Sequence, residues 1–125
     1  SKKVEQNRWE AYVDGGREKT GIDVMDWCSE AVEVGAGELL VTSVDRDGTR
    51  KGFEVDLLQM VSERVNVPVI ASGGLGSVHD AKSLMLNTKC EALAVADFIH
   101  MGRGHLLDIK KALLDEGFIM RMIKP

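Results

Sequence analysis

Two carboxylates, an arginine and a glycine follow an apolar run in the segment Thr42–Thr49, whose sequence is TSVDRDGT. The run before it, Leu39–Val41, predicts a buried strand, and polar residues at the carboxyl end of such a strand are typical of a reactive pocket in parallel α/β proteins. One of Asp45 and Asp47 could serve as general acid or base while the other holds Arg46 in place. The alternative is a solvated loop with an internal salt bridge.

A second junction of the same kind follows Val69–Ser72, an apolar strand that leads into the glycine-rich segment Gly73–Gly76. Glycines let the backbone approach an anion closely, and a helix that begins after Ser77 presents N–H groups with positive dipole. These features predict a phosphate cradle; the alternative is a tight turn from strand to helix that binds nothing. A dinucleotide-binding loop fits less well, because His79 stands where its third glycine belongs.

A third junction places Asp97 after the apolar segment 90–96, where its carboxylate could line the same pocket or cap the next turn. The other candidate ligands are dispersed, since no histidine stands at ligand spacing from either cysteine. We therefore expect no metal site and no cofactor, and two reduced cysteines in the core of a cytoplasmic protein. The side chains concerned are His79, His100, His105, Cys28 and Cys90.

The composition restricts the class of protein. The chain has 125 residues, of which 44% are hydrophobic and 29% are charged, and its net charge is −4. This composition is typical of one globular domain, which we expect to span residues 1–125, and not of a disordered chain. The negative charge argues against binding to nucleic acid, and no apolar run approaches the roughly 18 residues of a membrane span.

Strand-like and helix-like segments alternate along the chain, which predicts an α/β fold with a parallel sheet and right-handed crossovers. A hairpin of two strands is expected over residues 3–15, followed by a helix that Asp23 caps and that buries Trp27. Buried strands are expected at 38–44, 67–71 and 90–96, and further helices from residue 55, after a capping box at Ser77 and Asp80, and from Leu106 to Gly117. A doubly wound sheet and half of a (β/α)8 barrel both fit, since a complete barrel needs about 250 residues.

Four segments resemble one family of enzymes. Residues 35–49 (GAGELLVTSVDRDGT) are similar to the sixth strand and loop of the cyclase subunit of imidazole glycerol phosphate synthase, and residues 68–74 (PVIASGG) to its seventh strand. Residues 14–21 resemble the hairpin end and loop before its fifth helix, and residues 90–100 its eighth strand. The resemblance implies an α/β fold that is half of a (β/α)8 TIM barrel, from the end of the fifth unit through the eighth, with outer helices and an N-terminal hairpin.

The resemblance also implies roles for individual residues. Thr42, Ser43 and Asp47 match pocket positions of that family, and Asp45 is a further candidate pocket residue from its place in the loop. The phosphate site is expected at Gly48, Ser72, Gly73, Gly74, Ala96 and Asp97. The family commonly has a serine where this chain has Asp97, and a carboxylate there repels a phosphate dianion unless it is turned away or protonated. This difference indicates a divergent branch of the family.

The resemblance implies an activity as well. The family closes an imidazole ring with ammonia from a glutaminase partner, a lyase reaction of histidine biosynthesis on a bis-phosphorylated substrate. The family's two catalytic aspartates have no counterpart in this chain, so we expect it to bind a phosphorylated small molecule or inorganic phosphate without catalysing the reaction alone. Exposed strand edges predict self-association as a homodimer or higher oligomer. The alternatives are a non-catalytic self-assembling binding module and part of an ammonia-using synthase for a non-histidine substrate.

Overall fold

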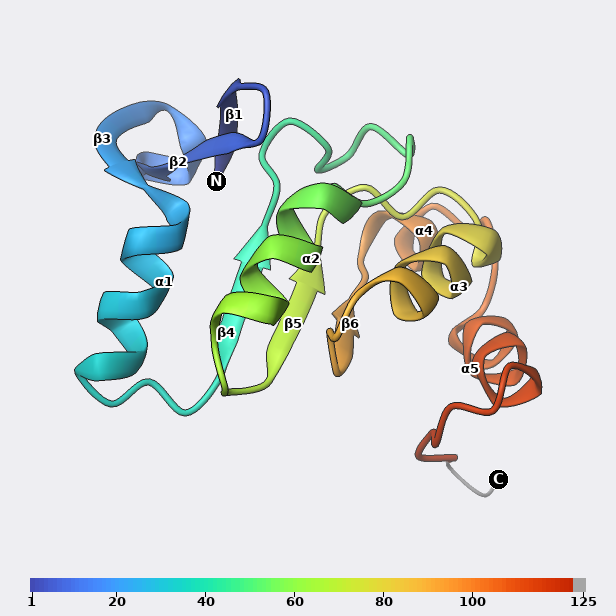
Figure 1. Cartoon of the computed structure of the whole chain (residues 1–125). Helices are drawn as coiled ribbons and strands as arrows, with labels where there is room; N and C mark the ends of the chain where they lie inside the picture. The colour runs from blue at the N-terminus through green and yellow to red at the C-terminus, as the bar shows by residue number, and fades with distance from the viewer. Residues whose placement is uncertain (123–125) are drawn as a thin grey trace.

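The computed structural model describes residues 1–122, which contain two three-stranded sheets (Figure 1). The first sheet is antiparallel and consists of β1 (Lys2–Glu5), β2 (Arg8–Val13) and β3 (Glu18–Asp23), with a 3-10 turn η1 (Asp14–Gly16) between β2 and β3. The sequence predicted only two strands and a loop in this region. The third strand forms because Gly15 and Gly16 take positive φ angles of 62° and 86°, which turn the chain back along β2.

The second sheet is parallel and has the strand order β4–β5–β6. Its strands are β4 (Leu39–Thr42), β5 (Val69–Ser72) and β6 (Ala92–Ala94). The helices are α1 (Val24–Glu33), α2 (Val55–Arg64), α3 (Val78–Asn87), the short α4 (Asp97–His100) and α5 (Leu106–Asp115). The predicted parallel β/α units are confirmed, although each strand is shorter than the apolar run that predicted it.

Successive residues of a strand point to opposite sides of the sheet, and here the two sides differ in burial. We call the side formed by Val41, Val69, Ala71 and Leu93 the covered face, because the first three belong to the main apolar cluster of the protein and Leu93 packs against it. Figure 1 shows α2 and α3 together on one side of the sheet. Both helices contribute to the same cluster through Leu57, Leu58, Val61, Ala81 and Leu84.

The other side, which we call the open face, carries two rows of residues that are neighbours across the three strands. The first row is Leu40, Ile70 and Ala92, and the second, nearer the carboxyl ends, is Thr42, Ser72 and Ala94. The apolar sequence of β4 predicted a strand covered on both faces, but Leu40 is 62% exposed. The described residues therefore build a sheet with cover on one face only.

Helix α1 begins where the sequence predicted, since the Asp23 carboxylate accepts a hydrogen bond from the Met25 N–H at 2.7 Å. Its buried side chains are Val24 and Cys28. The prediction that Trp27 lies in the core is wrong, because its side chain is 48% exposed. Helix α1 packs against β2, β3 and α2, and Figure 1 shows it at the β4 end of the parallel sheet, so only a narrow stripe of the helix is covered.

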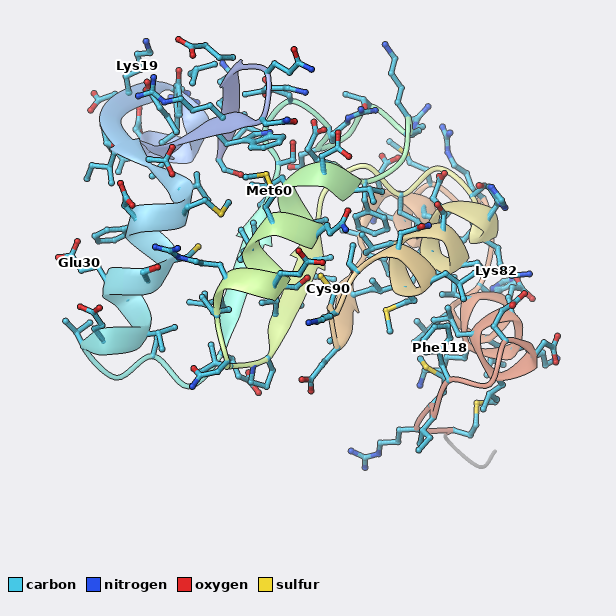
Figure 2. The ribbon with its side chains drawn as sticks, viewed as in Figure 1. Lys19, Glu30, Met60, Lys82, Cys90 and Phe118 are labelled. Atoms are coloured by element: carbon cyan, nitrogen blue, oxygen red, sulfur yellow. The ribbon has the colours of Figure 1, made fainter. Side chains whose placement is uncertain are left out.

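Helix α5 packs against α3 at the other end of the sheet. Ile109 and Leu113 are buried, whereas Leu106 and Leu114, which the helical spacing also predicted to face inward, are exposed. Lys82 of α3 forms an ion pair with the residue after α5, Glu116, and Figure 2 shows the Lys82 side chain next to α5. Like the other helices within residues 1–122, α5 is not long and apolar enough to cross a membrane.

Candidate phosphate-binding site

A cavity of about 140 Å³ lies at the carboxyl ends of the parallel strands. Its walls come from the loop after β4, the loop after β5 and the junction between β6 and α4. The residues that the resemblance assigned to a phosphate site all line it: Gly48, Ser72, Gly73, Gly74, Ala96 and Asp97. The fold thus brings together segments that are separated by up to about 50 positions in the sequence, because parallel strands end at one edge of the sheet.

The four candidate pocket residues at the end of β4 and in the loop after it do not all lie at this cavity. Asp47 lines the cavity. Thr42 lies on the open face, and Ser43 is buried with no hydrogen-bond partner for its hydroxyl among the described residues. The Asp45 carboxylate accepts a hydrogen bond from the Lys3 N–H at 2.7 Å, which ties the loop to the N-terminal sheet. Asp45 therefore has a structural contact rather than a place in the cavity.

The backbone of Ser43 holds the loop that follows it. Its carbonyl oxygen accepts hydrogen bonds from the N–H groups of Arg46 and Asp47, at 3.3 and 2.9 Å. Its own N–H donates to the Ser72 carbonyl at 3.2 Å, which continues the pairing of β4 with β5. Ser43 thus positions Asp47 at the cavity through main-chain contacts.

Arg46 points away from the carboxylates that were expected to hold it. Its Nε lies 3.3 Å from Oε2 of Glu54, a buried residue just before α2, and its Nη1 donates to the Lys51 carbonyl at 3.2 Å. The predicted pairing of Arg46 with Asp45 or Asp47 is wrong. The loop turns back on itself before α2, and this turn puts Glu54 within reach of the guanidinium.

The glycines after β5 are required by close contact between two backbones. Gly74 has φ +109°, and a Cβ there would lie 2.2 Å from the carbonyl oxygen of Gly52, whose N–H donates to the Gly74 carbonyl at 2.8 Å. A Cβ on Gly76 would lie 2.1 Å from the carbonyl oxygen of Arg50. The loops after β4 and β5 are therefore packed backbone to backbone, which requires glycine at these positions and fixes two walls of the cavity.

The predicted capping box at the start of α3 is confirmed. The Ser77 hydroxyl accepts from the Asp80 N–H, and the Asp80 carboxylate accepts from the Ser77 N–H. The same carboxylate also accepts the Gly76 N–H at 2.9 Å. These three donors are occupied within the protein, so they are not free to bind an anion. By contrast, the N–H groups of Gly73 and Gly74 donate to no backbone carbonyl within residues 1–122.

Sequence reasoning missed one charged residue of the cavity, Arg50. Its Nε donates to Oδ2 of Asp97 at 2.8 Å. This hydrogen bond lowers the pKa of the Asp97 carboxyl, which favours its ionised form. No spacing rule predicts that Arg50 pairs with Asp97, because the two residues are 47 positions apart. The only available signal was the unpaired carboxylate of Asp97 at the end of a predicted strand.

Parallel strands with helices on one face and a glycine-lined cavity at their carboxyl ends are features that β/α-barrel proteins have. Residues 2–105 match the family model described as histidine biosynthesis protein. The chain belongs to this family, and membership implies that its fold is a partial TIM barrel.

Relatives in the same family are similar along nearly the whole chain. The imidazole glycerol phosphate synthase subunit HisF of Prochlorococcus marinus (strain NATL1A) is 42% identical over 118 residues, which are 94% of this chain and 46% of that protein. The subunit of the same name from Streptococcus mutans serotype c is 40% identical over 121 residues, 97% of this chain and 48% of that protein. The chain therefore spans about half the length of the curated relatives it matches.

Proposed function

We propose that the chain is a phosphate-binding half of a barrel of the HisF cyclase type, a single domain over residues 1–125 that spans the end of the fifth β/α unit through the eighth. The observation that carries the proposal is the convergence of six glycine, serine, alanine and aspartate positions on one cavity. The ligand is a phosphorylated small molecule or inorganic phosphate.

The cavity offers three kinds of donor to a phosphate group. The N–H groups of Gly73 and Gly74 have no backbone partner within residues 1–122, and glycine allows an anion to approach them closely. Ser72 lines the cavity and can offer its hydroxyl, and Arg50 contributes a positive charge. Main-chain and hydroxyl donors bind phosphate oxygens, and a guanidinium adds charge-assisted hydrogen bonds.

The same cavity is poorly equipped for acid–base catalysis by the chain alone. Its two carboxylates are Asp47 and Asp97, and Asp97 is held ionised by Arg50. A positioned acid or base contributes typically about 10²–10⁴-fold to a rate, so a half without a well-placed pair turns over slowly. Ring closure with ammonia from a glutaminase partner belongs, in this proposal, to an assembly that supplies the other half.

Calorimetric titration with inorganic phosphate tests the binding proposal. We expect saturable binding of one phosphate per chain, weakened several-fold in Ser72→Ala, because one hydroxyl donor is lost. The matched control is Ser83→Ala on α3, outside the cavity, which should bind as the wild type does. Absence of saturation at millimolar phosphate would contradict the proposal.

An assay of ammonia-dependent turnover of the bis-phosphorylated substrate tests the second part. We expect turnover only when a separately produced N-terminal half of a HisF relative is added. Turnover by the chain alone would contradict the view that it is not catalytic by itself.

We further propose that a second copy of the chain covers the open face. Two three-stranded sheets whose open faces meet would bury the row of Leu40, Ile70 and Ala92, and the chain is about half as long as its relatives. Barrel interiors are filled by layers of such rows. Exposed apolar surface of this kind favours association, most simply with two-fold symmetry.

Light scattering at micromolar protein concentration distinguishes a monomer from a dimer or higher oligomer. The wild type is expected to be a dimer or higher oligomer, and Leu40→Glu is expected to be a monomer, because a charge on the open face opposes its burial. Leu86→Glu, a change at an exposed leucine of α3, is the control and should leave the oligomer intact. A monomeric wild type would refute self-association and leave a complementary half as the remaining occupant.

A further inference from the structure

The ion pair between Arg50 and Asp97 joins two different walls of the cavity. Arg50 belongs to the loop after β4, and Asp97 is the first residue of α4, after β6. Both residues line the cavity, and Nε of Arg50 lies 2.8 Å from Oδ2 of Asp97. We propose that Asp97 is a positioning residue that holds the Arg50 guanidinium at the cavity, so that Arg50 supplies the positive charge for a bound phosphate group. The inference rests on the proposed phosphate-binding function and names the group that completes it.

The backbone of Arg50 is fixed independently of its side chain. Its φ of +62° lies in the left-handed region, which residues other than glycine seldom adopt. Its carbonyl oxygen lies so close to Gly76 that a Cβ there would be 2.1 Å away. The neighbouring Gly52 N–H donates to the Gly74 carbonyl at 2.8 Å. The loop therefore anchors the base of the Arg50 side chain, and Asp97 anchors its head.

The charged side chains around the cavity leave Arg50 as the group that can attract a phosphate. Among the described residues that line it, Arg50 is the only cation, and Asp47 and Asp97 are the two anions. The bond to Asp97 uses Nε, and neither Nη group of Arg50 donates a hydrogen bond within residues 1–122. A guanidinium can bind a carboxylate with one edge and a phosphate with another, because its five N–H donors lie in one plane.

This role gives Asp97 two opposing effects on phosphate. Its negative charge repels the ligand, and its hydrogen bond orients the cation that attracts the ligand. Removing the carboxylate therefore gives a result that depends on whether Arg50 is present. A residue that only repelled phosphate, or only stabilised the fold, would not show this dependence.

The test is a double-mutant cycle of Arg50→Ala and Asp97→Asn, with inorganic phosphate as the probe and calorimetric titration as the measurement. Arg50→Ala is expected to weaken binding at least about tenfold, the effect of losing a charge-assisted hydrogen bond. Asp97→Asn is expected to weaken binding several-fold in the wild-type background and to strengthen it in the Arg50→Ala background. The opposite signs are the signature of positioning.

Two further variants serve as control and safeguard. Lys51→Ala removes a cation one position along the same loop, outside the cavity, and should leave phosphate binding unchanged. Arg50→Lys keeps the charge without the planar fork, so it should bind phosphate more weakly than the wild type but more tightly than Arg50→Ala. It keeps the test decisive if Arg50→Ala fails to fold.

The possible outcomes separate this inference from the function on which it rests. If Asp97→Asn strengthens binding equally in both backgrounds, Asp97 only repels the ligand and the positioning role is refuted. If wild type and Arg50→Ala bind phosphate equally well, the cavity still binds phosphate but Arg50 is not its cation. If the wild type binds no phosphate, both the proposed function and the positioning role are refuted.

Discussion

The covered and open faces of the parallel sheet are built from alternating residues of the same strands, yet they differ sharply in burial. Val41 belongs to the main apolar cluster, while its neighbour Leu40 is 62% exposed. Both residues are apolar, and both lie in a run that predicted a strand covered on two sides. The difference comes from α2 and α3, which lie on one side of the sheet (Figure 1). A continuously apolar strand thus indicates that both of its faces are buried in the complete protein. It does not show that the neighbouring helices of the same chain bury both.

The largest expected effect is a difference in the free energy of unfolding between leucine-to-alanine changes on the two faces. Leu84 of α3 is fully buried under the covered face, so Leu84→Ala should lower the free energy of unfolding by about 2–5 kcal/mol. Leu40→Ala on the open face should cost less than about 1 kcal/mol in the monomer, since Leu40 loses little contact. Urea unfolding of each variant at low protein concentration measures both values. Equal costs would mean that the open face is covered in solution even in the monomer.

A smaller effect on the free energy of unfolding is expected from two serines, one in a helix over the covered face and one on the open face. Ser62 of α2 is buried, and its hydroxyl accepts the Lys89 N–H at 3.1 Å and donates to the Gln59 carbonyl. Ser62→Ala leaves that N–H without a partner and should cost about 1–3 kcal/mol.

The matched change on the open face is Ser72→Ala, which should alter the free energy of unfolding by less than about 0.5 kcal/mol. Thermal and urea unfolding of the two variants, without phosphate, provide the comparison. A large cost at Ser72 would assign its hydroxyl a structural bond and weaken its place among the phosphate donors.

The smallest expected effect is a pH dependence of the free energy of unfolding, caused by a buried thiol in the apolar cluster under the covered face. Burial raises the pKa of the Cys90 thiol, which lies in the main apolar cluster two positions before β6 (Figure 2). In the unfolded chain a thiol titrates near pH 8.5, so above that pH the unfolded state releases a proton that the folded state keeps. The contribution of Cys90 to stability is therefore complete below the ordinary thiol pKa and declines as the pH rises toward the raised value.

The measurement is the difference in free energy of unfolding between wild type and Cys90→Ala from neutral to alkaline pH. This difference should shrink as the pH rises. Ala92→Cys, two positions further along on the open face, is the control and should show little such change, because an exposed thiol titrates similarly in both states. A difference that stays constant for Cys90→Ala would contradict the burial argument.

Much of the fold could be predicted from local signals. The caps at Asp23 and Ser77 and the parallel strand–helix units follow from residue types at fixed short spacings, because caps and amphipathic faces are local physics. Trp27 was predicted wrongly for a related reason. Helical spacing gives the face on which a side chain lies, whereas its burial depends on what packs against that face, and α1 lies at the sheet edge.

The charged residues of the site were harder to predict than its glycines. The positions at Gly73 and Gly74 were identified from the motif, and they do line the cavity. The partners of Arg46 and Asp97 could not be inferred, because Glu54 and Arg50 reach them only after the loop after β4 has folded back. Charge alone does not show which of several opposite charges a side chain will reach once the loop has folded.

The sequence by itself determined the alternation of strands and helices, the helix caps and the glycine-rich turns, since each depends on neighbouring residues. It also contained the family motif that residues 2–105 match. Only the tertiary structure decided that Asp47, Ser72 and Asp97 share one cavity, that Arg50 neutralises Asp97, and that one face of the sheet stays open. The physical reason is that ion pairs and burial depend on distances between segments, which the chain acquires only when its strands pair and its loops pack together.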